Sequence, residues 1–142
     1  MTDISTFDFG ALMLLLMLLA HFADDFHFQG ILADMKQRRW WEEQFRKHGE
    51  DMPAKYSRDY LCALAVHSLE WSIAVMLAPV ALGMWRHMGV VVTLVLFNAI
   101  SHAYVDDMKA NRREINLVED QSIHLVQIAC MWLCCLANLR LA

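Results

Sequence analysis

The chain has 142 residues, of which 58% are hydrophobic and 20% are charged, with a net charge of -4 and a mean hydropathy of +0.32. This length allows one domain, residues 1–142, and the hydrophobic fraction exceeds that of ordinary soluble domains. The four cysteines lie in apolar segments without zinc-finger spacing, which argues against a disulfide-rich or zinc-finger protein.

Four apolar segments are long enough to span a membrane, and they cover about 9–32, 60–82, 85–108 and 118–139. A spanning helix needs about 20 mostly apolar residues. The runs 11–20 and 89–97 lack the polar face of a helix in a soluble bundle, which is the alternative fold. The sequence therefore predicts an all-α integral membrane four-helix bundle made of two helical hairpins.

The loop at 34–58 combines basic and aromatic side chains. Lys36, Arg38 and Arg39 come first, and Trp41 and Phe45 then share one face of a helix. This pattern favours a short helix at the membrane surface, against anionic lipid head groups. An ordinary positive-inside loop with interfacial aromatic residues is the alternative. Acidic residues interrupt the basic run, so we expect no nucleic-acid binding: Glu42, Glu43, Glu50 and Asp51.

The basic residues also predict the topology. Every Lys and Arg except Arg86 and Arg140 lies in the first loop or in the loop between the third and fourth spans. Basic loops stay in the cytoplasm. We therefore expect a protein of the bacterial inner membrane with both basic loops in the cytoplasm and both termini outside.

Histidine and aspartate recur four residues apart inside the spans, in three pairs: His21 and Asp25, His102 and Asp106, Asp120 and His124. A spacing of four puts both members on one face of a helix. With the predicted topology, all three pairs lie toward the cytoplasm, each histidine about 6 Å deeper than its aspartate. Because ionisable residues inside a membrane usually have a function, we expect the pairs to meet in one pocket.

This residue set favours a divalent metal, because imidazole and carboxylate are ligands for zinc, iron and manganese. Zinc is the preferred choice, and a mononuclear or a dinuclear site remains open. The predicted ligands are His21, Asp25, His67, His102, Asp106 and His124. Glu70 and Asp120 are the predicted catalytic carboxylates, with Gln29 and Gln121 as residues that orient ligands. The alternative is that buried, hydrogen-bonded histidines and aspartates only hold the helices together.

A short internal repeat supports a shared site. Residues 20–25 and 101–107 each contain a small residue, a histidine and, four residues later, an aspartate, and each precedes a basic loop. Two related hairpins that face one another would place such motifs around one centre.

These residues resemble a family of small bacterial and phage membrane proteins known only as a domain of unknown function. The resemblance rests on HxxxDFxxQ from His21, on His67, on SHxxxD from Ser101 and on DQxxH from Asp120, and it covers most of the chain except the first loop. More distantly, the pattern is similar to membrane-bound proteins assigned as metal-dependent hydrolases. Family members often have another histidine in the second span, where this chain has Glu70.

The predicted function is therefore a membrane-embedded metal protein, a metal-dependent hydrolase of a lipid or lipid-linked group at the cytoplasmic face. One alternative is a protein that binds haem or that binds or transports metal ions. Another is a non-enzymatic phage or host membrane effector that recruits a partner through the basic aromatic loop. Membrane lipids are the expected partners, and an oligomer is allowed.

Overall fold

The computed structural model describes residues 6–140, and this part of the chain is helical without a strand. The long helices are α1 (Thr6–Ala23), α4 (Asp59–Ala81), α5 (Met88–Asp107) and α6 (Leu117–Arg140). Shorter segments join them: the π-helix η1 (Asp24–Phe28), α2 (Leu32–Met35), α3 (Arg38–Lys47), the 3-10 helices η2 (Ala54–Tyr56) and η3 (Met84–His87), and the π-helix η4 (Met108–Arg112). The predicted all-α class is confirmed.

Four stretches are long and apolar enough to cross a membrane: Phe7–Phe28, Ala54–Ala81, Met84–Arg112 and Leu117–Leu139. Their outward faces carry large apolar side chains, such as Leu19, Leu77 and Ile100, which are 62%, 63% and 73% exposed. A helix on the surface of a soluble protein would carry polar residues there. These are the features of an integral membrane protein.

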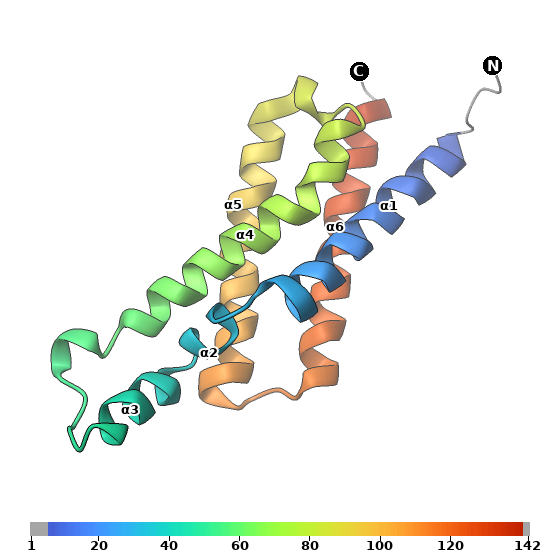
Figure 1. Ribbon diagram of the computed structural model, residues 1–142. Helices are drawn as coiled ribbons and strands as arrows, with labels where there is room; N and C mark the ends of the chain where they lie inside the picture. Colours follow the sequence, from blue (N-terminus) through green and yellow to red (C-terminus); the bar gives the residue numbers. More distant parts are fainter. Residues whose placement is uncertain (1–5, 141–142) are drawn as a thin grey trace.

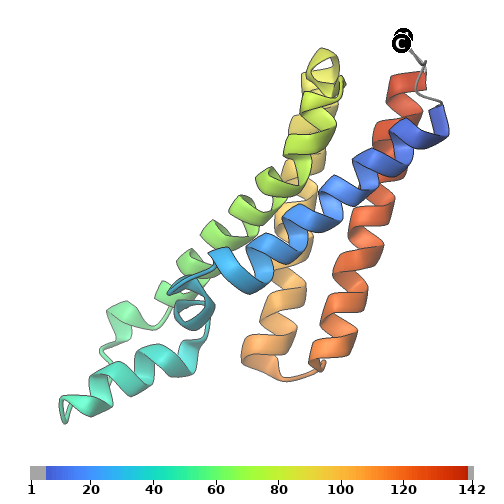
Figure 2. The same ribbon diagram turned by 45° about the vertical axis from the view of Figure 1, so that its right-hand side comes forward.

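The four long helices form a bundle in which α1 runs obliquely against α4 and α6 (Figures 1 and 2). The most extensive packing between long helices joins α4 to α5, followed by α1 on α4. The most extensively packed pair of helices, α4 and α5, thus comes from the middle of the chain, where η3 makes a short connection between them. The start of α1, the end of α6 and the α4–α5 connection lie at one end of the bundle (Figure 1).

The first span ends earlier than predicted. α1 stops at Ala23, η1 continues to Phe28, and a turn follows in which Gly30 has a φ of 52°. Residues with a side chain avoid this left-handed region, so a glycine here ends the helix at low cost. Leu32, the predicted end of the span, begins α2 instead.

The chain has two basic segments, the first loop with α3 and the connection between α5 and α6 with η4. They meet at the other end of the bundle, where α3 approaches this connection (Figure 1). Asn111 in η4 joins them. Its Nδ2 donates to the carbonyl oxygen of Lys36 at 3.1 Å, and its Oδ1 accepts from the backbone N–H of Arg38 at 2.8 Å. A helix therefore forms in the first loop as predicted, and it is fastened to the second basic segment.

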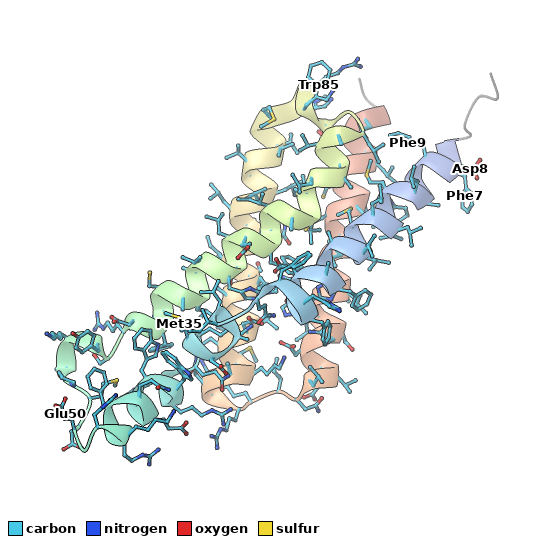
Figure 3. All side chains as sticks on the ribbon, in the orientation of Figure 1. Phe7, Asp8, Phe9, Met35, Glu50 and Trp85 are labelled. Carbon is cyan, nitrogen blue, oxygen red and sulfur yellow. The ribbon has the colours of Figure 1, made fainter. Side chains whose placement is uncertain are left out.

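The core changes character along the bundle. The half nearer the α4–α5 connection has an apolar core that includes Met13, Met17, Val75, Met84 and Ile128. In a membrane such packing stabilises the bundle through close contact, because lipid is as apolar as the side chains. The other half buries imidazoles and carboxylates. Trp85, 57% exposed, marks the apolar end, and Glu50 lies beyond α3 at the basic end (Figure 3).

The shared position of the basic segments predicts their accessibility. Starting from a variant without native cysteines, because Cys62 and Cys130 are exposed, we expect Trp40→Cys and Arg113→Cys to react with an impermeant maleimide only after permeabilisation of cells. Arg86→Cys, at the opposite end, should react in intact cells. Labelling of positions 40 and 86 from the same side would contradict this topology.

Candidate metal centre

Every long helix contributes a histidine to one buried cluster. His21 lies near the end of α1, His67 in the first half of α4, His102 near the end of α5 and His124 in the first half of α6. All four are completely buried. The expectation that the predicted pairs meet between the helices agrees with this geometry, since none of these histidines faces the outside of the bundle.

The first group of ligand atoms lies between η1, α4 and α5. The Nε2 atoms of His67 and His102 are 3.3 Å apart. Asp25 Oδ1 lies 3.6 Å from the His67 nitrogen and 4.0 Å from the His102 nitrogen. Asp106 Oδ2 lies 3.5 Å from the His67 nitrogen and 3.7 Å from the His102 nitrogen. Two nitrogens bound to one tetrahedral zinc at about 2.1 Å would be about 3.4 Å apart. These four side chains therefore fit the spacing of a metal site.

The second group, His102, Asp106 and His124, lies between α5 and α6 and shares His102 and Asp106 with the first. Asp106 Oδ1 is 3.4 Å from His124 Nε2, which is also 3.4 Å from Asp120 Oδ1. His124 Nε2 and Asp120 Oδ1 are both buried without a hydrogen-bond partner in the described part of the chain. The two oxygens of Asp106 therefore face different histidine groups, as a carboxylate does when it bridges two metals.

Hydrogen bonds indicate which nitrogens are available as ligands. Gln127 Oε1 lies 2.8 Å from His124 Nδ1, so a proton on Nδ1 leaves Nε2 free to bind a metal. His21 differs, because its Nδ1 accepts the Trp71 indole N–H at 2.9 Å. This bond puts the proton of a neutral His21 on Nε2. His21 therefore lies beside the two groups rather than in them, although it was predicted as a ligand.

Trp71 is a member of the site that the sequence analysis did not find. Its ring stacks on His102 at 4.2 Å between centroids, while His124 stacks against His102 at 4.1 Å. Together with its bond to His21, Trp71 holds two imidazoles in place. It lies four residues after His67 on the same face of α4, and this spacing could have indicated it.

Two lysines that the sequence analysis assigned only to the basic loops reach the buried carboxylates. Lys36 Nζ donates to Asp106 Oδ2 at 2.6 Å, and Lys109 Nζ donates to Asp120 Oδ2 at 2.6 Å. Burying a carboxylate costs several kcal/mol unless an opposite charge lies close to it. The lysines supply that charge from the basic end of the bundle.

Of the remaining predicted residues, Gln29 and Gln121 contact the site and Glu70 does not. Gln29 and Gln121 donate to Asp25 at 3.2 and 3.1 Å, as expected for residues that orient a ligand. Asp24 Oδ2 lies 3.7 Å from His67 Nδ1, on the side of the ring away from the first group. Glu70, however, is exposed on α4 and lines an apolar groove with Val66, Leu69, Ile73, Ala74 and Leu77. The structure does not bring Glu70 into the cluster.

A π-helix lies at the end of both His-x-x-x-Asp motifs. η1 begins at Asp24 and contains Asp25, whereas η4 begins at Met108, two residues after Asp106. π-helical turns are rare and often occur at functional sites. The internal repeat of the sequence thus corresponds to a repeated backbone feature.

No family model, curated protein or solved structure matches this chain. The candidate site therefore rests on its geometry.

Replacement of Lys36, which pairs with Asp106, gives a direct test of the cluster. Lys36→Met should lower stability by about 3–5 kcal/mol in the presence of a chelator, because Asp106 would be left buried without its cation. Zinc should restore much of the loss. Thermal unfolding of the protein in detergent measures both effects.

Arg38→Met is the matched control for this test. It removes a cation whose pair with Glu42 is exposed, with side chains 57% and 49% accessible, so the change should stay below about 1 kcal/mol. Equal losses in both variants would contradict a specific role for Lys36.

Proposed function

We propose that this protein binds divalent metal in the cluster and hydrolyses a lipid or lipid-linked group at the cytoplasmic face of the membrane. The observation that carries the proposal is the pair of ligand groups, Asp25 with His67 and His102, and His102 with Asp106 and His124. The potential ligand atoms of each group lie within 4.8 Å of one another.

The residues that would hold the metal are Asp25, His67 and His102 at one position, and His102, Asp106 and His124 at the other. Zinc, iron and manganese all accept such mixed nitrogen and oxygen ligands, with zinc preferred. A divalent ion there would acidify water and neutralise charge that develops on a substrate oxygen.

Asp120 is the proposed general base. It is completely buried, its Oδ1 has no hydrogen-bond donor in the described part of the chain, and its Oδ2 accepts from Lys109. Oδ1 can therefore take a proton from water, while Lys109 holds the carboxylate in position. Glu70 is left out of this role because it is exposed on α4 and does not line the cavity beside the cluster.

A cavity of about 320 Å³ gives access to the site from the basic end, and Asp25 and Asp106 both contribute to its lining. A substrate anchored in the cytoplasmic leaflet would meet this opening at the level of α3. The aromatic and basic side chains of α3 suit contact with anionic lipid head groups.

The geometry offers less support to haem binding or transport. His102 packs against both Trp71 and His124, with ring centroids 4.2 and 4.1 Å from its own, and haem binding would require these contacts to open. Transport would require a polar path through the other half of the bundle, whose core includes Met13, Met84 and Met131. A non-enzymatic effector would not need the buried cluster at all, whereas the hydrolase uses it.

Metal content tests the first half of the proposal. Detergent-purified protein should carry about one or two zinc, iron or manganese ions per chain. His102→Ala should lose most of this metal, because His102 belongs to both ligand groups. Elemental analysis by plasma mass spectrometry measures the change, with His27→Ala, an exposed histidine next to the cluster, as the control. Wild-type protein that is folded, active and free of metal would overturn the proposal.

Turnover tests the second half. In mixed micelles that present a panel of bacterial lipids and lipid-linked precursors, Asp120→Asn should keep its metal and lose roughly 10²–10⁴-fold in rate, as expected for removal of a general base. Asp107→Asn is the matched control, because Asp107 pairs with Arg112 outside the cluster. A rate unchanged by Asp120→Asn would exclude Asp120 as the base, and no turnover of any lipid would reject the hydrolase.

A further inference from the structure

The cavity beside the cluster is lined by an unusual combination of charges. Two of its carboxylates, Asp25 and Asp106, belong to the candidate metal centre. Four cationic side chains line the same space: Lys36, Arg39, Lys109 and Arg113. A metal centre alone needs ligands, but it does not need this number of cations around its entrance.

The cations are not all used by the buried aspartates. Lys36 and Lys109 pair with Asp106 and Asp120. Arg39 donates from Nε to Gln37 Oε1, which is a neutral amide, and the Arg113 side chain makes no hydrogen bond or ion pair in the described part of the chain. Two guanidinium groups therefore line the cavity without a carboxylate partner, and they favour an anion there.

The backbone also places Arg113 in an uncommon way. It is the residue other than glycine with a positive φ in the described chain, with a φ of 58°. This conformation costs roughly 1–2 kcal/mol for a residue with a side chain, so glycine or asparagine would be favoured if only the turn mattered. Such strain is often found at functional positions.

Apolar side chains complete the lining and indicate how the anion is carried. Phe26 and Leu117 line the same cavity, and they are 55% and 53% exposed. Both lie at the ends of spanning stretches, where a ligand with an apolar chain would enter from the bilayer. The cavity therefore has cations for a head group and apolar surface for its attachment.

We infer that this cavity binds the phosphate group of a phosphate monoester, with Arg39 and Arg113 on its oxygens. Guanidinium groups bind phosphate through paired, charge-assisted hydrogen bonds, and a phosphate would lie next to carboxylates that can hold a divalent ion. This inference names the substrate class of the proposed hydrolase and rests on it for the reaction. Hydrolysis would join a water oxygen to phosphorus, break the bond from phosphorus to the carrier oxygen, and leave one water proton on that oxygen.

Binding can be measured without turnover. Native mass spectrometry of the full chain in detergent, with metal removed by a chelator, should show one bound dioleoyl phosphatidic acid and much weaker binding of dioleoylglycerol, which lacks the phosphate. Arg39→Gln with Arg113→Gln should weaken phosphatidic acid binding by about tenfold or more, because both charge-assisted contacts are lost. Arg38→Gln with Arg112→Gln removes equal charge from side chains paired with Glu42 and Asp107, and it should change binding less than about twofold.

The arms of this experiment separate the possible outcomes. Competition by inorganic phosphate or glycerol phosphate, with no preference for the lipid, would support the phosphate site and identify a soluble carrier. Equal losses in the two double variants would show only general attraction to a basic surface and would overturn the inference. Metal analysis of the same samples keeps the proposals apart, because phosphate binding by a protein that never holds metal would reject the hydrolase alone, and metal without phosphate binding would reject the phosphate site alone.

Discussion

The burial of carboxylates inside an apolar bundle is the constraint on which the rest of this structure depends. Asp106 is 3% exposed, and one of its oxygens accepts from Lys36 while the other faces His124. An unpaired charge in this position would cost several kcal/mol, more than any one apolar contact in the bundle supplies. The oblique course of α1, the early end of the first span and the return of the chain toward α5 all bring compensating groups to this carboxylate.

The repeated π-helices show how the fold meets this constraint twice. At each His-x-x-x-Asp motif a π-helical segment ends the span, and a lysine further along the chain pairs with a buried aspartate of another helix. An i→i+5 turn changes the direction of the residues that follow relative to a continued α-helix. In one case the lysine is Lys36, which reaches α5, and in the other it is Lys109, which reaches α6. The short repeat in the sequence therefore marks a repeated way of closing the polar end of the bundle.

Apolar length and helical spacing were sufficient to predict the four spans and the approach of the histidine and aspartate pairs, because both depend on the regular geometry of single helices. The position of Lys36 against Asp106 could not be predicted, because these residues are 70 positions apart in the sequence. Their contact depends on the turn at Gly30, which directs the chain back toward α5. Glu70, predicted as a catalytic carboxylate, is exposed on α4 for a related reason. A residue three positions away can lie on either edge of a buried stripe, and the stripe on α4 runs through His67 and Trp71.

Lysine and metal would compete for the same oxygen of Asp106, and this competition links the parts of the proposed mechanism. Lys36 now lies on Oδ2, the atom that also faces His67 and His102. A divalent ion bound by these residues would take over the neutralisation of Asp106, and Lys36 already lines the cavity next to Arg39. Released from Asp106, its ammonium group would add a further cation to the space where we infer that phosphate binds. Metal loading would then strengthen the affinity for an anionic substrate through the redistribution of one positive charge, without any rearrangement of the helices.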